Sequence, residues 1–291
     1  MKNWQHRLLL AGVIAPPILF FTILVFGWMT PGYDPAYQYI SELGAKESPV
    51  KTLANVFGFG LTGVLTMLFA AGMFSLPSLR AAGKLAAIFF FAGGALMVLT
   101  GVFNCDAGCV TAVATGEGRL HNLVSDPLQF SALGLGFVIF FVEAVRIPSL
   151  RWLVPFIAVM GLGSLLVHYV VIAWPVASAY PGIIQRISIG LAYALLMLIA
   201  AGVHRGADGS GGGIFPRRGR FLYWAAGVLL AVSMVGFVFI VASARTKPYA
   251  GIPGVCKNAA ECRTACLNNY GRCSSYCAND PEAPVCAALP F

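Results

Sequence analysis

The stretch at residues 85–103 reads LAAIFFFAGGALMVLTGVF and contains no charged side chain. A helix needs about 20 apolar residues to cross a lipid bilayer, so this stretch predicts a membrane span. The whole chain has the same character: of its 291 residues, 58% are hydrophobic and 10% are charged, whereas a soluble domain has about 25% charged residues. So few charges cannot cover a water-facing surface, and we expect most of the exterior to face lipid.

Seven stretches of the chain are long and apolar enough to span a bilayer. They lie near residues 8–29, 53–76, 85–103, 128–145, 152–174, 183–203 and 221–242. Glycine and proline interrupt them more than a soluble helix tolerates, but helices inside a membrane bundle absorb such breaks, and small residues let helices approach closely. The sequence therefore predicts an all-α, polytopic membrane helix bundle with seven transmembrane helices.

The first apolar stretch has the basic flank of a signal peptide, because Lys2 and Arg7 precede it. It is longer than the apolar core of a signal peptide, which has about 7–15 residues, and no clear small-residue cleavage site follows it. We expect it to be retained as a span.

Lysine and arginine are unevenly distributed between the two sets of span ends. One set carries ten: Lys2, Arg7, Arg80, Lys84, Arg146, Arg151, Arg205, Arg217, Arg218 and Arg220. The opposite loops, before the tail, carry four: Lys46, Lys51, Arg119 and Arg186. The positive-inside bias predicts a multi-pass cell-membrane protein with a cytoplasmic N-terminus and an extracytoplasmic C-terminal tail. The basic residues follow this topology pattern and form no nucleic-acid-binding surface, so the expected partner is the lipid bilayer and not a nucleic acid.

Four segments follow from this reading. Residues 1–205 form a six-helix transmembrane domain, 206–220 a flexible cytoplasmic linker rich in glycine and then arginine, 221–242 the seventh helix and 243–291 a cysteine-rich tail.

The tail holds six of the eight cysteines: Cys256, Cys262, Cys266, Cys273, Cys277 and Cys286. A spacing of four residues puts two thiols on one helix face, so a small α-hairpin would pair Cys262 with Cys277 and Cys266 with Cys273. Cys256 would then close on Cys286. Zinc is the alternative, since the spacing also fits its ligands, but the tail has no histidine and its predicted compartment is oxidising. Capping, partner binding and protease resistance all remain open as its role.

Cys105 and Cys109 lie in a predicted outer loop of sequence NCDAGC. A local disulfide across Gly108 is the structural interpretation. A catalytic thiol is the alternative, although no neighbouring residue marks either cysteine as a low-pKa nucleophile.

Polar and ionisable residues gather on the predicted outer face. The candidate cluster is Ser41, Glu42, Asp106, His121, Asp126, Gln185 and Arg186, with His168 below it in the fifth span. Carboxylates and histidine suit metal ligation or acid–base chemistry, and an arginine can hold an anionic headgroup. Asp106 or Asp126, His121, and Ser41 or Ser125 would suit acyl transfer. The sequence identifies no cofactor and leaves metal binding open.

A resemblance is carried by four features: ISELG at 40–44, FNCD at 103–106, His121 before the fourth span, and Gln185-Arg186 at the start of the sixth. Together they resemble the DUF998 family of prokaryotic integral membrane proteins, over about residues 1–205. The resemblance implies six spans with outer-face polar residues at Ser41, Glu42, Cys105, Asp106, His121, Gln185 and Arg186. The family's function is unassigned, so no reaction is implied. The seventh span and the tail depart from its pattern.

Two classes of function remain. The first is a non-enzymatic accessory, sensor or scaffold protein whose tail binds a protein partner, which we favour because the polar cluster lacks a diagnostic catalytic spacing. The alternative is a membrane-embedded lipid hydrolase or acyltransferase that acts on a lipid or lipid-like ligand at the outer leaflet. A transporter is a weaker third, since His168 is the single ionisable residue near mid-membrane in the predicted spans, where coupling sites usually lie.

Overall fold

A computed structural model describes residues 3–30, 33–36, 38–109, 114–169, 181–208 and 228. The predicted seventh span, apart from Val228, lies outside the described residues. So do most of the linker and all the tail cysteines, whose pairing stays a prediction.

The described residues contain six helical segments that are long and apolar enough to cross a membrane. They are Asn3–Met29, Lys51–Phe74, Ala81–Val102, Gly116–Arg146, Pro148–Tyr169 and Pro181–Gly206. These segments confirm the all-α polytopic architecture and correspond to the first six predicted spans. Which end of the bundle faces the cytoplasm stays a prediction from the lysine and arginine bias.

Several spans are built from more than one helical piece. The helices are α1 (Asn3–Met29), α2 (Lys51–Leu53), α3 (Leu61–Phe74), α4 (Ala81–Val102), α5 (Gly116–Leu123), α6 (Gln129–Arg146), α7 (Val154–Phe156), α8 (Leu162–Tyr169) and α10 (Pro181–Asp208). Wider π-helical turns at Ala54–Gly60, Val124–Leu128 and Ile157–Gly161 join α2 to α3, α5 to α6 and α7 to α8. Short 3-10 turns lie at Ile40–Gly44, Ala107–Cys109 and Pro148–Leu153.

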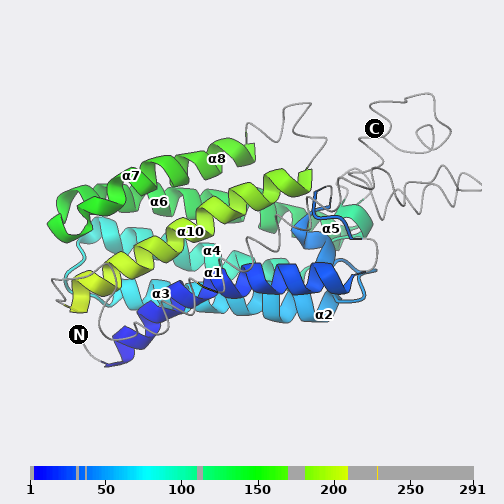
Figure 1. The fold of residues 1–291 in the computed structure, drawn as a ribbon, viewed down its shortest axis with the longest axis horizontal. Coiled ribbons are helices and arrows are strands. Elements are labelled where there is room, and N and C mark those ends of the chain that lie inside the picture. The colour runs from blue at the N-terminus through cyan, green and yellow to red at the C-terminus, as the bar shows by residue number, and fades with distance from the viewer. Residues whose placement is uncertain are drawn as a thin grey trace, which may run out of the picture.

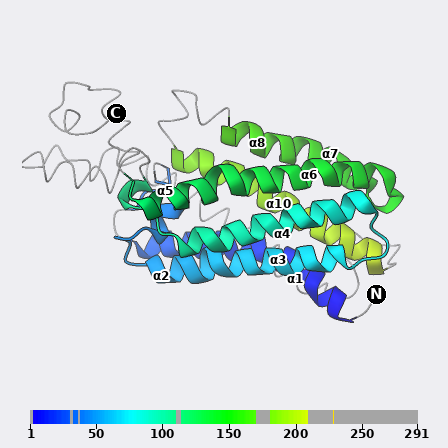
Figure 2. The same cartoon turned by 180° about the vertical axis from the view of Figure 1, so that it is seen from behind.

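The long helices run side by side along the length of the molecule (Figure 1). The N-terminus of α1 and the C-terminal end of α10 lie at one end, and α2 and α5 lie at the other, as the reverse view also shows (Figure 2). We call the second end the loop end. It carries the turn Ile40–Gly44 and the turn Ala107–Cys109, which contact each other.

Glycines allow a close contact between α3 and α4. A Cβ added to Gly63 of α3 would lie 2.5 Å from the main-chain oxygen of Gly94 of α4, and a Cβ added to Gly94 would lie 2.8 Å from that of Gly63. Lipid gives helices little hydrophobic reason to associate, so close backbone packing at small residues holds them together. This agrees with the close helix packing expected from the small residues of the spans.

The exterior of the bundle is apolar, as the composition requires. Val159 and Leu162 are 73% and 60% exposed. Phe69, Phe90 and Tyr193 are buried between the helices. An exposed apolar belt around a buried apolar core is stable in lipid and not in water, which supports a membrane location.

Candidate functional site

The turn Ile40–Gly44 buries the carboxyl group of Glu42, which is 8% exposed. Its Oε1 accepts a hydrogen bond of 2.8 Å from the backbone N–H of Tyr39, and its Oε2 accepts one of 2.9 Å from Gln38 Nε2. Burial raises the pKa of Glu42 to about 7, although these hydrogen bonds and the charge of Arg186 oppose the shift. The loop thus holds an acid that titrates near neutrality.

Arg186 lies in the first turns of α10 and is 6% exposed. Its Nη1 donates to the main-chain oxygens of Gln38, at 2.8 Å, and Gly182, at 2.9 Å. Its Nη2 donates to the hydroxyl of Tyr33. Burial raises the pKa of Tyr33 to about 12, so Tyr33 stays neutral beside the guanidinium. Arg186 therefore holds the first loop, which lies between α1 and α2, against α10.

Gln185, the neighbour of Arg186, also serves the first loop. Its Oε1 accepts a hydrogen bond of 2.6 Å from the backbone N–H of Ile40. This bond satisfies a donor at the start of the turn Ile40–Gly44, where helical turns leave N–H groups without internal partners. Gln185 and Arg186 thus act as a pair that positions one loop.

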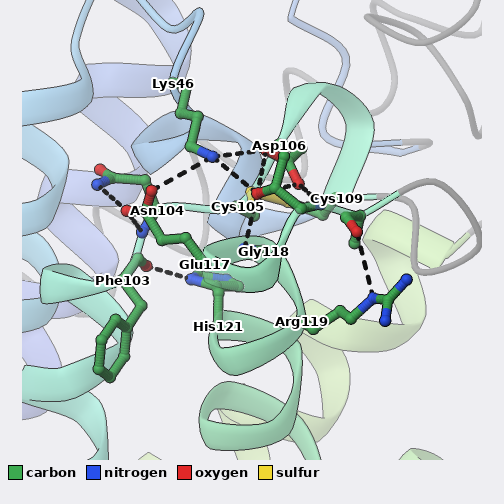
Figure 3. Close-up of polar contacts among 12 residues, drawn as sticks. Lys46, Phe103, Asn104, Cys105, Asp106, Cys109, Glu117, Gly118, Arg119 and His121 are labelled. Atoms are coloured by element: carbon green, nitrogen blue, oxygen red, sulfur yellow. Dashed lines mark hydrogen bonds and ion pairs between the residues drawn. A yellow bond between two sulfur atoms is a disulfide. The ribbon is translucent and has the colours of Figure 1, made fainter.

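A second polar group surrounds Asp106 (Figure 3). Lys46 Nζ lies 2.7 Å from Asp106 Oδ1 and 3.3 Å from Glu117 Oε2, and the backbone N–H of Thr115 donates to Asp106 Oδ2 at 2.7 Å. Burial alone would raise the pKa of Asp106, but the bonds from Lys46 and Thr115 outweigh it and lower that pKa. The hydrogen bond with Asp106 in turn raises the pKa of Lys46. Both groups therefore stay charged at neutral pH.

Asn104 extends this group to two further elements. Its backbone N–H and its Nδ2 donate to Glu117 Oε1 of α5, at 2.9 and 2.8 Å. Its Oδ1 accepts a bond of 2.8 Å from Asn55 Nδ2, which also donates to the oxygen of Gly44. The chain after α4 is thereby tied to α5 and to the second span.

A disulfide joins Cys105 to Cys109 beside the first loop. The hydroxyl of Ser41 lies 3.3 Å from Cys109 Sγ, and Cys105 Sγ lies 3.4 Å from the main-chain oxygen of Ser41. A disulfide sulfur carries no proton, so the hydroxyl is the donor to Cys109. Ser41 therefore connects the first loop to the loop after α4 that contains the disulfide, which we call the disulfide loop.

His121 of α5 is 2% exposed, and its Nδ1 lies 2.6 Å from the main-chain oxygen of Phe103. A carbonyl oxygen only accepts hydrogen bonds, so Nδ1 carries the proton. Within the described part of the chain, no hydrogen bond or ion pair joins His121 to Asp106 or Asp126.

Asp126 has a different histidine partner. Its Oδ1 pairs with Nε2 of His168 on α8. The ring of His168 also stacks on Phe130, with centroids 3.6 Å apart. His168 is therefore a paired, packed residue below the loop end, as ionisable groups at membrane depth usually are.

The model of the DUF998 family, described as proteins of unknown function, matches residues 13–202 of the chain. This chain belongs to the DUF998 family. It is accordingly a polytopic membrane protein of a family without an assigned function. The predicted seventh span and tail lie beyond the matched segment. No curated protein and no solved structure matched the chain.

The loop end of this DUF998 protein divides the candidate residues among three groups. Glu42, Gln185 and Arg186 surround the first loop. Ser41, Asp106 and His121 lie around the disulfide loop, and Asp126 pairs with His168. The aspartate–histidine–serine arrangement considered for acyl transfer is therefore not linked by hydrogen bonds among the described residues.

The candidate cluster predicted from the sequence did not include Lys46, Tyr33, Gln38 or Asn104. Lys46 could have been found from the sequence, because it is a lysine in a predicted outer loop, where the positive-inside bias disfavours lysine, and that loop also contains acidic residues. Asn104 could have been found as well, because it belongs to the motif FNCD at 103–106. Gln38 and Tyr33 left no such signal, since their partner Arg186 is distant in sequence.

Proposed function

We propose that this DUF998 protein is a non-enzymatic accessory, sensor or scaffold protein of the cell membrane. In this proposal the loop end faces the extracytoplasmic side and forms a rigid polar platform. One observation carries it: Arg186, the candidate cation for an anionic headgroup, is 6% exposed and donates to Gln38, Gly182 and Tyr33 of its own chain. A guanidinium engaged in this way holds a loop and has little capacity left for a substrate.

The other candidate groups support the same conclusion. A general base must reach the proton it abstracts, with its orienting partner beside it. Here Nδ1 of His121 faces a main-chain oxygen, and Asp106 forms its ion pair with Lys46. These contacts stabilise the loops, as in a structural network.

The test compares Glu42→Gln with Glu47→Gln, an exposed glutamate in the same loop. We expect Glu42→Gln to alter the melting temperature of the detergent-purified protein, and both variants to leave the lipid profile of the producing cells at the wild-type pattern. A Glu42→Gln protein that folds normally and abolishes a lipid change seen with the wild type would overturn the proposal in favour of a lipid hydrolase or acyltransferase.

The tail supplies the partner-binding part of the proposal. Residues 243–291 combine six cysteines with a predicted extracytoplasmic position. Photo-crosslinking from this segment in intact cells should trap one protein partner, and serine replacement of its cysteines should remove the product. Recovery of no defined partner would contradict a scaffold role.

A further inference from the structure

We propose that Cys105, Cys109 and His121 form a zinc site that a dithiol controls. The site is closed while the two sulfurs form a disulfide. It opens when the disulfide is reduced, and then binds Zn²⁺ through two thiolates and one imidazole nitrogen. The predicted compartment is oxidising, so the disulfide is the resting form and the zinc form exists only while a dithiol reductant is supplied. This metal site is separate from the accessory role proposed above. It depends on its three ligands and not on that role.

The ligand atoms are already close. One sulfur from each cysteine and one nitrogen of His121 lie within 4.8 Å of one another. At a tetrahedral angle, Zn–S bonds of about 2.3 Å and Zn–N bonds of about 2.0 Å put two ligand atoms of one ion about 3.5 to 3.8 Å apart. The spacing Cys-x3-Cys also lies within the usual range for zinc ligands. The two sulfurs must separate from their bonded distance, and the nitrogen must approach them by about 1 Å at most.

The histidine is prepared as a ligand. Nδ1 donates to the main-chain oxygen of Phe103, which leaves the lone pair of the neutral ring on Nε2. Nε2 is buried and has no hydrogen-bond partner among the described residues. Histidines that bind metal almost always donate their other ring N–H to a carbonyl or carboxylate. Nε2 of His121 is thus an acceptor that no described residue uses, and one nitrogen of its ring lies within 4.8 Å of both sulfurs.

The backbone explains how the site opens. Gly108 and Cys109 have φ angles of 69° and 52°, in the left-handed region that residues other than glycine avoid. Cys109 has this conformation in the disulfide form. Cys109 is half-buried whereas Cys105 is buried, so a reductant reaches Cys109 first. Reduction breaks the bond between the sulfurs, so that the Cys109 side chain can rotate and both sulfurs can bind one ion.

The chemistry balances with a dithiol as the reductant. Thiol–disulfide exchange oxidises the external dithiol to its disulfide and leaves Cys105 and Cys109 as two thiols, with two electrons and two protons transferred. Zn²⁺ then displaces both thiol protons, which pass to solvent, and neutral His121 supplies the third ligand. Two thiolates cancel the charge of the ion, and a fourth position remains for water. Exchange with an external disulfide reverses the step: it re-forms the Cys105–Cys109 disulfide, reduces the external disulfide to a dithiol with two protons from solvent, and releases Zn²⁺.

The experiment uses the full chain in detergent, reduced under anaerobic conditions and incubated with Zn²⁺ or with a chelator. A maleimide then labels free thiols, and mass spectrometry of the proteolytic peptides separates Cys105 and Cys109 from the tail cysteines. We expect Zn²⁺ to protect Cys105 and Cys109 in the reduced wild type. His121→Gln should require at least about 10-fold more Zn²⁺ for the same protection, because even the loss of an outer partner of a zinc ligand costs about 10- to 100-fold in affinity.

His168→Gln is the matched control, since His168 pairs with Asp126 outside the site, and it should keep wild-type protection. Co²⁺ provides a second readout that does not depend on labelling: thiolate-to-cobalt absorption should appear in the reduced wild type and lose intensity in Cys109→Ser. Equal protection in wild type and His121→Gln, or zinc-independent labelling of both cysteines, would overturn the zinc site. Neither result would affect the accessory role, whose test measures lipids and folding.

Discussion

The guanidinium of Arg186 donates to the main-chain oxygen of Gln38 at 2.8 Å, across a separation of 148 residues. This bond joins the start of the last described helix to the loop that follows the first. The bond fixes the position of the loop, because a buried charged donor is strongly unfavourable without its acceptors. The contact therefore joins two elements of the loop end that are far apart in the sequence.

Arg186→Ala should therefore destabilise the protein strongly. The substitution removes hydrogen bonds to Gln38, Gly182 and Tyr33, and leaves buried acceptors without a donor. We expect the free energy of unfolding to fall by about 3 to 5 kcal/mol, measured by denaturant unfolding in detergent. Arg119→Ala is the control, because Arg119 is exposed and surface substitutions usually change stability by about 0.5 kcal/mol or less. Equal effects of the two changes would contradict the role given to Arg186.

Glu42 should make stability depend on pH. Its pKa rises from the ordinary value of 4.5 to about 7 in the folded protein, so the folded state holds the proton more tightly than the unfolded state. The contribution of Glu42 is therefore most favourable below pH 4.5 and becomes less favourable as the pH rises through about 7. At about 1.4 kcal/mol per pKa unit, the total change is about 3 kcal/mol.

Glu42→Gln isolates this effect, because glutamine does not titrate. The stability of the wild type minus that of Glu42→Gln, measured by unfolding at a series of pH values, should fall between pH 4.5 and about 7. A difference that stays constant over this range would show that the carboxyl group keeps its ordinary pKa.

Two glycines of α5 give a matched pair for the disulfide loop. A Cβ added to Gly118 would lie 2.2 Å from Asp106 Oδ2, whereas a Cβ added to Gly116 meets nothing within 4 Å. Gly118→Ala should push Asp106 away from Thr115 and Lys46 and lower the free energy of unfolding by about 1 to 3 kcal/mol. Gly116→Ala should be neutral or stabilising by up to about 1 kcal/mol, since alanine favours a helix. Thermal unfolding of the two purified variants measures the difference, and a stable Gly118→Ala would contradict this packing.

The spans were predictable because their signal is local. A run such as residues 85–103 is apolar throughout, and α4 follows it closely at Ala81–Val102. The family was also recognisable, because short motifs such as ISELG at 40–44 are contiguous. A membrane span must be apolar over one continuous segment, and this property can be read directly from the sequence.

The pairing of the polar side chains was not predictable. His121 and two aspartates lie close in sequence, yet His121 bonds to the oxygen of Phe103, and Asp126 takes His168 from another span. A main-chain acceptor has no signature in the sequence. Which of several acids a histidine contacts depends on how each helix is rotated about its own axis in the bundle. The sequence thus identified many of the polar residues of the loop end but not their partners.

The buried Glu143 leads to a prediction at the opposite end of the bundle, where no site was expected. Its side chain on α6 is 0% exposed, and Oε1 accepts a hydrogen bond of 2.6 Å from the backbone N–H of Arg80, just before α4 begins. It thus satisfies a donor that a helix start leaves without a partner. Glu143→Ala should lower the free energy of unfolding by about 1 to 3 kcal/mol. Glu143→Gln should retain most of the stability, because an amide oxygen also accepts from Arg80. Unfolding in detergent compares the two, and equal losses would mean that the charge of Glu143, and not its acceptor, stabilises this end.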